Sequence, residues 1–87
     1  MTTERQIEIL MEDGCTKSEA KKYLDRNGVT IFTAKDFEGN FEQYMEEWYI
    51  DENDLQAYKN MIEKKIPVAD WGIVTDEEDT YYIMYEN

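Results

Sequence analysis

The sequence predicts an α+β fold, mostly helical, that ends in an antiparallel β-hairpin. Up to residue 66, apolar residues recur at intervals of three and four, as on helices that bury one face. After Pro67, the single proline, the spacing changes to the alternation typical of strands. At 87 residues, with two Trp, seven Tyr and three Phe, the chain is long enough for one small core. We therefore expect one domain, residues 1–87, with about four helices and then a hairpin at 70–86.

A tight helical hairpin is predicted for residues 1–28. Thr3 and Gln6 have the spacing of a capping box at the start of the first helix. Gly14 suits the left-handed position that ends such a helix. Thr16 and Glu19 repeat the capping box for a second helix, which the following Asn-Gly pair stops.

The next residues, Val29–Phe32, are β-prone and form either an extended connector or a short third strand. Thr33 can then cap a third helix. Its apolar side chains keep helical spacing, which favours one continuous helix over 34–49: Phe37, Phe41, Tyr44, Met45 and Trp48. The weak point is Gly39-Asn40, where Asn40 is able to cap a shorter helix instead.

A further helix is predicted to begin after Asp51, a favourable N-cap residue, and to end before Pro67. Together with the third helix it makes residues 33–66 a region of two longer helices. In the C-terminal hairpin, Tyr81, Ile83 and Tyr85 should face one side, and Tyr82 and Met84 the other. Because an isolated hairpin is marginal in stability, one face should pack on the helices.

Composition excludes several classes of function. The chain has no histidine, so a His-based triad, an imidazole zinc site and a His general base are all ruled out. One cysteine, Cys15, rules out Cys-rich zinc sites and an internal disulfide. Glycines form no phosphate-binding pattern. We expect no enzyme activity, no cofactor and no metal site.

Two features address location. The N-terminus lacks a basic region followed by an apolar core, and no apolar run reaches the roughly 20 residues that a membrane span needs. A cytoplasmic protein that does not bind membranes is expected. The sequence leaves its oligomeric state open.

The net charge of −12 arises from two acidic blocks, offset by a net +2 on residues 55–69. Residues 36–54 hold eight acids and no base, and residues 70–87 hold six acids and no base. Both blocks belong to elements with apolar faces, so the two could meet in one negative surface. Such a field attracts basic surfaces and repels nucleic acids.

These observations predict a binding surface for a basic, nucleic-acid-binding protein, without direct contact to nucleic acid. Carboxylates would occupy the places of phosphates, and Tyr49 or a hairpin tyrosine would add an apolar anchor. The residues expected to bind the partner are Asp36, Glu38, Glu42, Glu46, Glu47, Tyr49, Asp51, Glu52, Asp54, Asp76, Glu77, Glu78 and Asp79.

The chain shows two resemblances. Ile7, Leu10, Gly14, Glu19-Ala20 and Leu24 resemble the first two helices of ubiquitin-associated domains. Cys15 replaces an apolar residue of those domains and no matching third helix follows, so ubiquitin binding is not inferred. In size, acidity and lack of catalytic residues the chain resembles anti-CRISPR and antirestriction inhibitors of phages and mobile elements, several of which act as DNA mimics.

Two other readings remain. One is a protein–protein adaptor that binds through the helical hairpin, around Leu10, Met11, Cys15 and Tyr23. The other is an accessory domain whose charge serves solubility alone.

Overall fold

The computed structural model describes residues 1–86, and within them the chain forms five helices and three strands. The α+β class is confirmed, with one more helix than predicted. In chain order the elements are α1 (Thr3–Glu12), α2 (Lys17–Asp25), β1 (Val29–Thr33), α3 (Ala34–Gly39), α4 (Phe41–Glu47), α5 (Glu52–Lys64), β2 (Gly72–Thr75) and β3 (Thr80–Tyr85).

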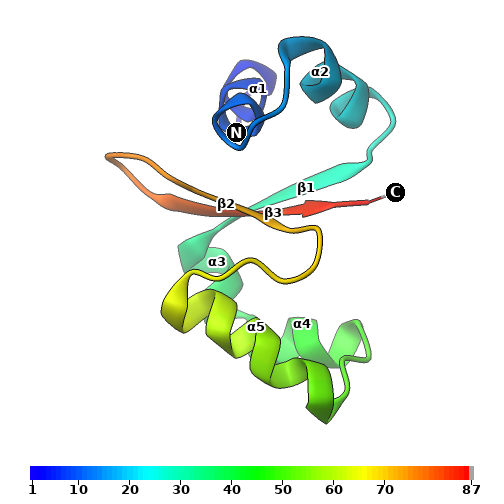
Figure 1. The fold of residues 1–87 in the computed structure, drawn as a ribbon, viewed down its shortest axis with the longest axis vertical. Helices are drawn as coiled ribbons and strands as arrows, with labels where there is room; N and C mark the ends of the chain where they lie inside the picture. The colour runs from blue at the N-terminus through cyan, green and yellow to red at the C-terminus, as the bar shows by residue number, and fades with distance from the viewer. Residues whose placement is uncertain (87) are drawn as a thin grey trace.

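The strands form one antiparallel sheet in the order β1-β3-β2, with helices on both of its faces (Figure 1). The pair α1–α2 covers one face, and α3, α4 and α5 cover the other. Residues 29–33 are therefore a true strand, whose Ile31 lies opposite Ile83 of β3. Because β3 is the middle strand, it contributes side chains to both cores.

Alternation along β3 divides its side chains as the sequence predicts. Tyr81, Ile83 and Tyr85 face α1 and α2, and Tyr82 and Met84 face the other three helices. One face of the hairpin packs on helices, as expected, and the other face packs on helices as well. Tyr81 and Tyr82 are consequently both buried.

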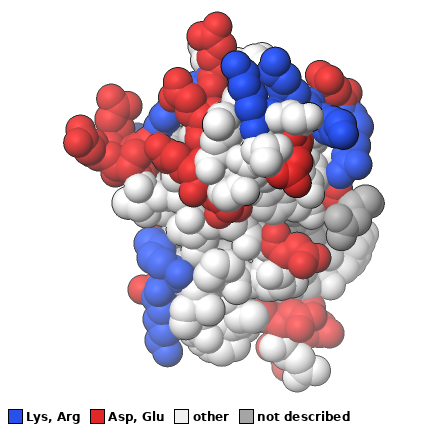
Figure 2. All heavy atoms as spheres, turned by 45° about the horizontal axis from the view of Figure 1, so that its top comes forward, with Lys and Arg blue, Asp and Glu red and all other residues white. Residues whose placement is uncertain are grey.

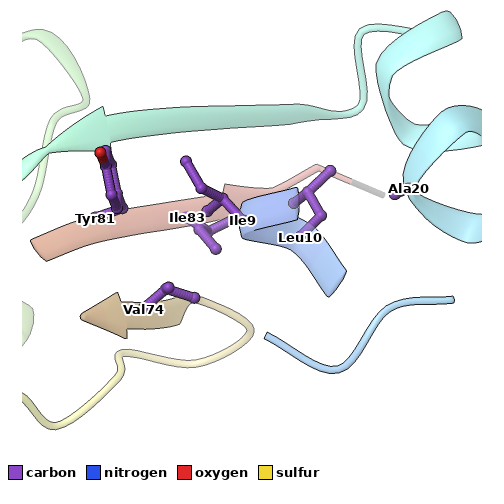
Figure 3. Close-up of a cluster of buried hydrophobic side chains, with 6 residues drawn as sticks. All are labelled: Ile9, Leu10, Ala20, Val74, Tyr81 and Ile83. Carbon is purple, nitrogen blue, oxygen red and sulfur yellow. The ribbon is translucent and has the colours of Figure 1, made fainter. Parts of the chain in front are cut away.

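The α1–α2 side of the sheet holds a small aliphatic core (Figure 3). Its buried members come from two helices and two strands: Ile9, Leu10, Ala20, Val74, Tyr81 and Ile83. At about 25 cal/mol per Å² of apolar surface, each aliphatic side chain here contributes about 1.5–3 kcal/mol on burial. Leu10 is completely buried, so it takes no part in an adaptor surface on the hairpin.

Capping residues set the ends of the helical hairpin. Thr2, one residue before the predicted Thr3, is the N-cap of α1 and accepts from the amide of Arg5. The Thr16–Glu19 capping box of α2 is confirmed in both of its hydrogen bonds. Each cap satisfies amides that the first turn of a helix leaves without partners.

The prediction of one continuous helix over 34–49 is wrong, because the chain breaks at Asn40 into α3 and α4. Asn40 makes no capping hydrogen bond at the start of α4. Its side chain instead donates back to the main-chain oxygen of Asp36, 2.9 Å away. Residues 33–66 thus hold three helices, where two were predicted.

The aromatic stripe forms the second core despite the break. Phe37 is fully buried and lies 5.2 Å from the ring centre of Tyr82 of β3. Phe41, Tyr44 and Trp48 pack around it, partly buried. Trp71, just before β2, stacks on Phe32 at 5.9 Å. This side of the sheet is therefore built mainly from aromatic rings, whose paired packing adds about 0.5–1.5 kcal/mol per pair.

Candidate functional site

The acids of the two blocks occupy different parts of the molecule. Those of the first block lie on α3, on α4 and at the start of α5, on one side of the sheet. The acids at 76–79 form the turn between β2 and β3, which projects beside α1 (Figure 1). Figure 1 places α4 and the start of α5 at the far end of the molecule from this turn. The acids of the turn at 76–79 therefore lie apart from those of α4 and the start of α5.

The turn at 76–79 is held by its own carboxylates. Asp76 accepts hydrogen bonds from the amides of Glu78 and Asp79, both at 2.8 Å, and forms an ion pair with Arg5 of α1. Asp79 accepts from the amide of Thr80 at 2.8 Å. Two of the four predicted binding residues here are thus engaged in shaping the turn, which leaves Glu77 and Glu78 exposed.

The face that holds this turn also carries basic residues. In the upper part of Figure 2, which brings α1 and α2 forward, most of the acids lie to the left and most of the Lys and Arg residues to the right. Four exposed bases on or next to α2 belong to this face: Lys17, Lys21, Lys22 and Arg26. The α1–α2 side of the molecule therefore presents mixed charge.

The acids of the first block lie among few bases, Lys35 on α3 and Lys59 and Lys64 on α5. Within residues 1–86 both ion pairs belong to Arg5, so the eight acids of the first block form none. Three of them accept hydrogen bonds within the fold, and Glu47 does so from the side chain of Gln43 at 3.0 Å. Asp51 caps α5 through the amide of Asp54 at 3.0 Å. Asp36 accepts from the hydroxyl of Tyr44 at 2.8 Å, which ties α3 to α4 and raises the pKa of Tyr44.

An apolar groove lies between α4 and α5, among the remaining acids. Its volume is about 430 Å³. Met45 is buried, and Phe41, Ile50 and Leu55 are partly exposed. The exposed residues that line the groove are Glu42, Glu46, Tyr49 and Lys59. This is the only hollow with a mainly apolar lining that includes predicted binding residues, among the five described for residues 1–86.

Tyr49 is held at the edge of this groove by an unusual backbone. The amide of Tyr49 donates to the main-chain oxygen of Glu46, and that of Ile50 donates to the oxygen of Met45. These two bonds define a Schellman motif, in which the residue after the C-cap is left-handed and usually glycine. Here that residue is Tyr49, with φ +54° and a side chain 92% exposed.

The left-handed backbone and the exposure of Tyr49 are both unfavourable. A left-handed residue with a side chain costs roughly 1–2 kcal/mol relative to the right-handed form. An aromatic ring in water also forgoes its burial energy. Because neither cost is recovered inside the fold, the position of Tyr49 favours a contact outside it.

A second hollow, of about 410 Å³, lies where α1 meets the sheet. Tyr85 donates to Asp13 at 2.6 Å, and its hydroxyl lies 3.7 Å from the sulfur of Cys15. Burial, and then the bond to Asp13, raise the pKa of Tyr85, so the phenol keeps its proton and serves as a donor. Asp13 also lies against Gly72 of β2. We assign this cluster to docking of α1 on the sheet.

Groups suited to a metal are absent from the described part of the chain, residues 1–86. In the same residues every buried side-chain nitrogen and oxygen atom has a hydrogen-bond partner. No helix in this range is long and apolar enough to cross a bilayer.

Sequence reasoning missed five residues of the groove: Phe41 and Met45 as wall residues, Ile50, Leu55 and Lys59. Phe41 and Leu55 were assigned to the core faces of their helices. Both side chains do pack partly against the core. Their remaining exposed surface depends on the angle between α4 and α5, for which the sequence has no signal. Comparison with known proteins adds nothing, since no family model, curated protein or solved structure matches the chain.

Proposed function

We propose that this protein is a non-enzymatic binding protein that uses the α4–α5 end against a basic, nucleic-acid-binding partner protein. The observation that carries the proposal is the groove between α4 and α5, with exposed Glu42, Glu46 and Tyr49 along it and no ion pair among its acids. An unpaired acidic surface with an aromatic anchor has the composition of a protein-binding site for a basic partner.

In this mechanism the carboxylates of α4 and of the start of α5 take the places that phosphates occupy on the partner. Arg and Lys of the partner make charge-assisted hydrogen bonds with carboxylates as they do with phosphates. The same charge repels DNA and RNA, so the protein competes with nucleic acid and does not bind it. The protein thus acts as a DNA-mimic inhibitor of the anti-CRISPR or antirestriction type.

The turn at 76–79 has a smaller part in this proposal than the sequence predicts. Asp76 and Asp79 are used within the turn, and Arg5 lies beside them. We therefore assign the principal contact to Glu42, Glu46 and Glu47, with Glu52 and Asp54 next to them on α5.

A pull-down with a charge-reversed variant tests the proposal. The protein and its Glu42→Lys, Glu46→Lys, Glu47→Lys variant serve as baits, washed at about 0.1 M and then about 0.5 M salt. The wild-type bait should hold a nucleic-acid-binding protein that elutes at the higher salt or on addition of duplex DNA. The variant should hold none. Equal capture by both baits, or a partner indifferent to duplex DNA, would contradict the proposal.

The matched control reverses three exposed acids that do not line the groove and lie in the last turns of α1, α2 and α5. The variant Glu12→Lys, Asp25→Lys, Glu63→Lys changes the net charge by the same amount. If only net charge mattered, the control would lose the partner as the first variant does. Retention of the partner by the control would locate the contact at α4 and α5.

A further inference from the structure

The groove between α4 and α5 has room for side chains, which a surface that only mimics phosphates does not need. Its volume of about 430 Å³ exceeds that of a large apolar side chain several times. Met45 at 6% exposure lies beneath partly exposed Phe41, Ile50 and Leu55. In the monomer the apolar lining of this hollow stays exposed to water, which is unfavourable, and a ligand that fills the hollow would remove that exposure.

Charge around the groove restricts what can fill it. Glu42 and Glu46 lie four positions apart on the same face of α4, and both line the groove. One base, Lys59 of α5, also lines it. An acidic or nucleic-acid ligand is repelled by the two carboxylates and by the acids at the start of α5. A ligand with both apolar and cationic side chains satisfies both parts of the lining.

Tyr49 determines how such a ligand is held. Its ring is 92% exposed and lines the groove, and its main chain is fixed by the two hydrogen bonds at the end of α4. A tyrosine side chain has two torsion angles and so loses little conformational freedom on binding, and tyrosine is enriched among residues that dominate interface energies.

We propose that the groove binds a basic amphipathic helix of a partner protein, with the helix's apolar residues in the groove and its Lys or Arg residues on Glu42 and Glu46. Tyr49 covers the apolar residues from the side. This is the helix-in-groove mode of recognition, in which apolar anchors recur one helical turn apart. The inference rests on the proposed function and adds that affinity for the partner has an apolar component that salt does not remove.

The experiment compares two fluorescein-labelled synthetic peptides of about 16 residues. Both carry six Lys or Arg residues, and one has four leucines at helical i, i+4, i+7 and i+11 spacing, where the other has glutamines. Fluorescence anisotropy measures binding to the full-length protein at about 0.05 M and about 0.5 M salt. NMR amide shifts on the labelled protein locate the contact.

The leucine peptide should bind at least about tenfold more tightly than the glutamine peptide. At the higher salt only the leucine peptide should remain bound, and the shifted amides should lie on α4 and α5. Tyr49→Gly should remove most of the preference for the leucine peptide. Ile66→Ser is the matched control, because Ile66 is 54% exposed but does not line the groove.

Three results would overturn this inference in distinguishable ways. Equal affinity of both peptides, lost at higher salt, means that the surface recognises charge alone, and the proposed function stands without the groove. No binding of either peptide at low salt removes both the groove and the acidic surface as sites for a basic partner. Preference for leucine that survives in Tyr49→Gly but shifts amides of α1 and α2 would also reject the assignment to the groove.

Discussion

Helices α1 and α4 end in the same pair of main-chain hydrogen bonds, but the left-handed residue is Gly14 after α1 and Tyr49 after α4. At the end of α1 the fold uses the motif for docking, since Asp13 binds Tyr85 and lies against Gly72. At the end of α4 nothing of the fold covers Tyr49. The same backbone turn thus attaches one helix to the sheet and presents a side chain to solvent at the other.

Helix α2 provides an intermediate case. It ends in the same motif with Asn27 in the left-handed position, at φ +52°. Asparagine tolerates this conformation better than any residue with a large side chain. The series Gly14, Asn27 and Tyr49 therefore runs from the residue best suited to the motif to one poorly suited, and only the last lies at the candidate site.

The largest effect on the docked end is expected from Gly72→Ala. An added methyl group at Gly72 would overlap the carboxylate of Asp13, which would have to leave its position beside β2. Overpacking of this kind costs up to about 3 kcal/mol of the free energy of unfolding. Urea denaturation would measure it, with Gly39→Ala as the control, because nothing lies within 4 Å of a methyl group there. Equal stability of the two variants would refute the docking role of Asp13.

Gly14→Ala tests the motif itself. Space is available, since no atom lies within 4 Å of the added methyl group, but the backbone has φ +106°. The strain should lower the free energy of unfolding by about 2 kcal/mol. If chemical denaturation shows no change in the free energy of unfolding, the turn tolerates a side chain without strain. That result would weaken the comparison with Tyr49.

Tyr85→Phe removes the bond from the docked end to the sheet. A hydrogen bond to a carboxylate contributes about 1.5 kcal/mol, so stability should fall by about that amount at pH 7. The raised pKa of Tyr85 adds a pH dependence. Above pH about 10 the unfolded chain loses the phenolic proton while the folded chain keeps it, so wild-type stability falls as pH rises further.

Unfolding of both proteins between pH 8 and pH 11 would check this sign. The decline above pH 10 should be smaller in Tyr85→Phe, since the group that titrates is gone. A parallel decline in the two proteins would assign it to other tyrosines.

Tyr49→Gly should have the smallest effect on stability, and in the opposite direction. Relief of the left-handed strain, offset by the greater freedom of glycine in the unfolded chain, should raise the free energy of unfolding by about 0.5–1 kcal/mol. Asn27→Gly should change it by a few tenths at most. Thermal unfolding would rank the two. A destabilised Tyr49→Gly variant would mean that the tyrosine serves the fold.

The elements that follow from local rules could be read from the sequence. Capping by Thr16, Thr33 and Asp51 depends on a side-chain oxygen that accepts from the main-chain amide three residues later, and alternation on β3 depends on the pleat alone. The break at Asn40 could not be predicted from the sequence, because Phe37 and Phe41 belong to the same core whether or not the helix is continuous. The spacing of these aromatic residues fits one continuous helix and two shorter helices equally well, so it could not distinguish the two.

The candidate site was predictable in its charges and in Tyr49, but not in its shape. The acids on α4 are a property of composition, whereas the groove depends on the angle at which α5 returns over α4. The distance between the acids at 76–79 and those of α4 also depends on tertiary structure, because it is set by the position of β3 in the middle of the sheet. The sequence contained no signal for that strand order.

The strand order also has a consequence for how the chain folds as it is synthesised. The middle strand, β3, follows every other described element in sequence, and β1 pairs with it from more than fifty residues away, Val29 opposite Tyr85. Neither hydrophobic cluster is complete until Tyr82 and Ile83 have been added. A growing chain therefore carries two helical layers that wait for one strand, and the pairing of that strand with β1 joins residues far apart in sequence. Folding should begin only when nearly all of these residues have left the ribosome, in a single late step that joins both layers.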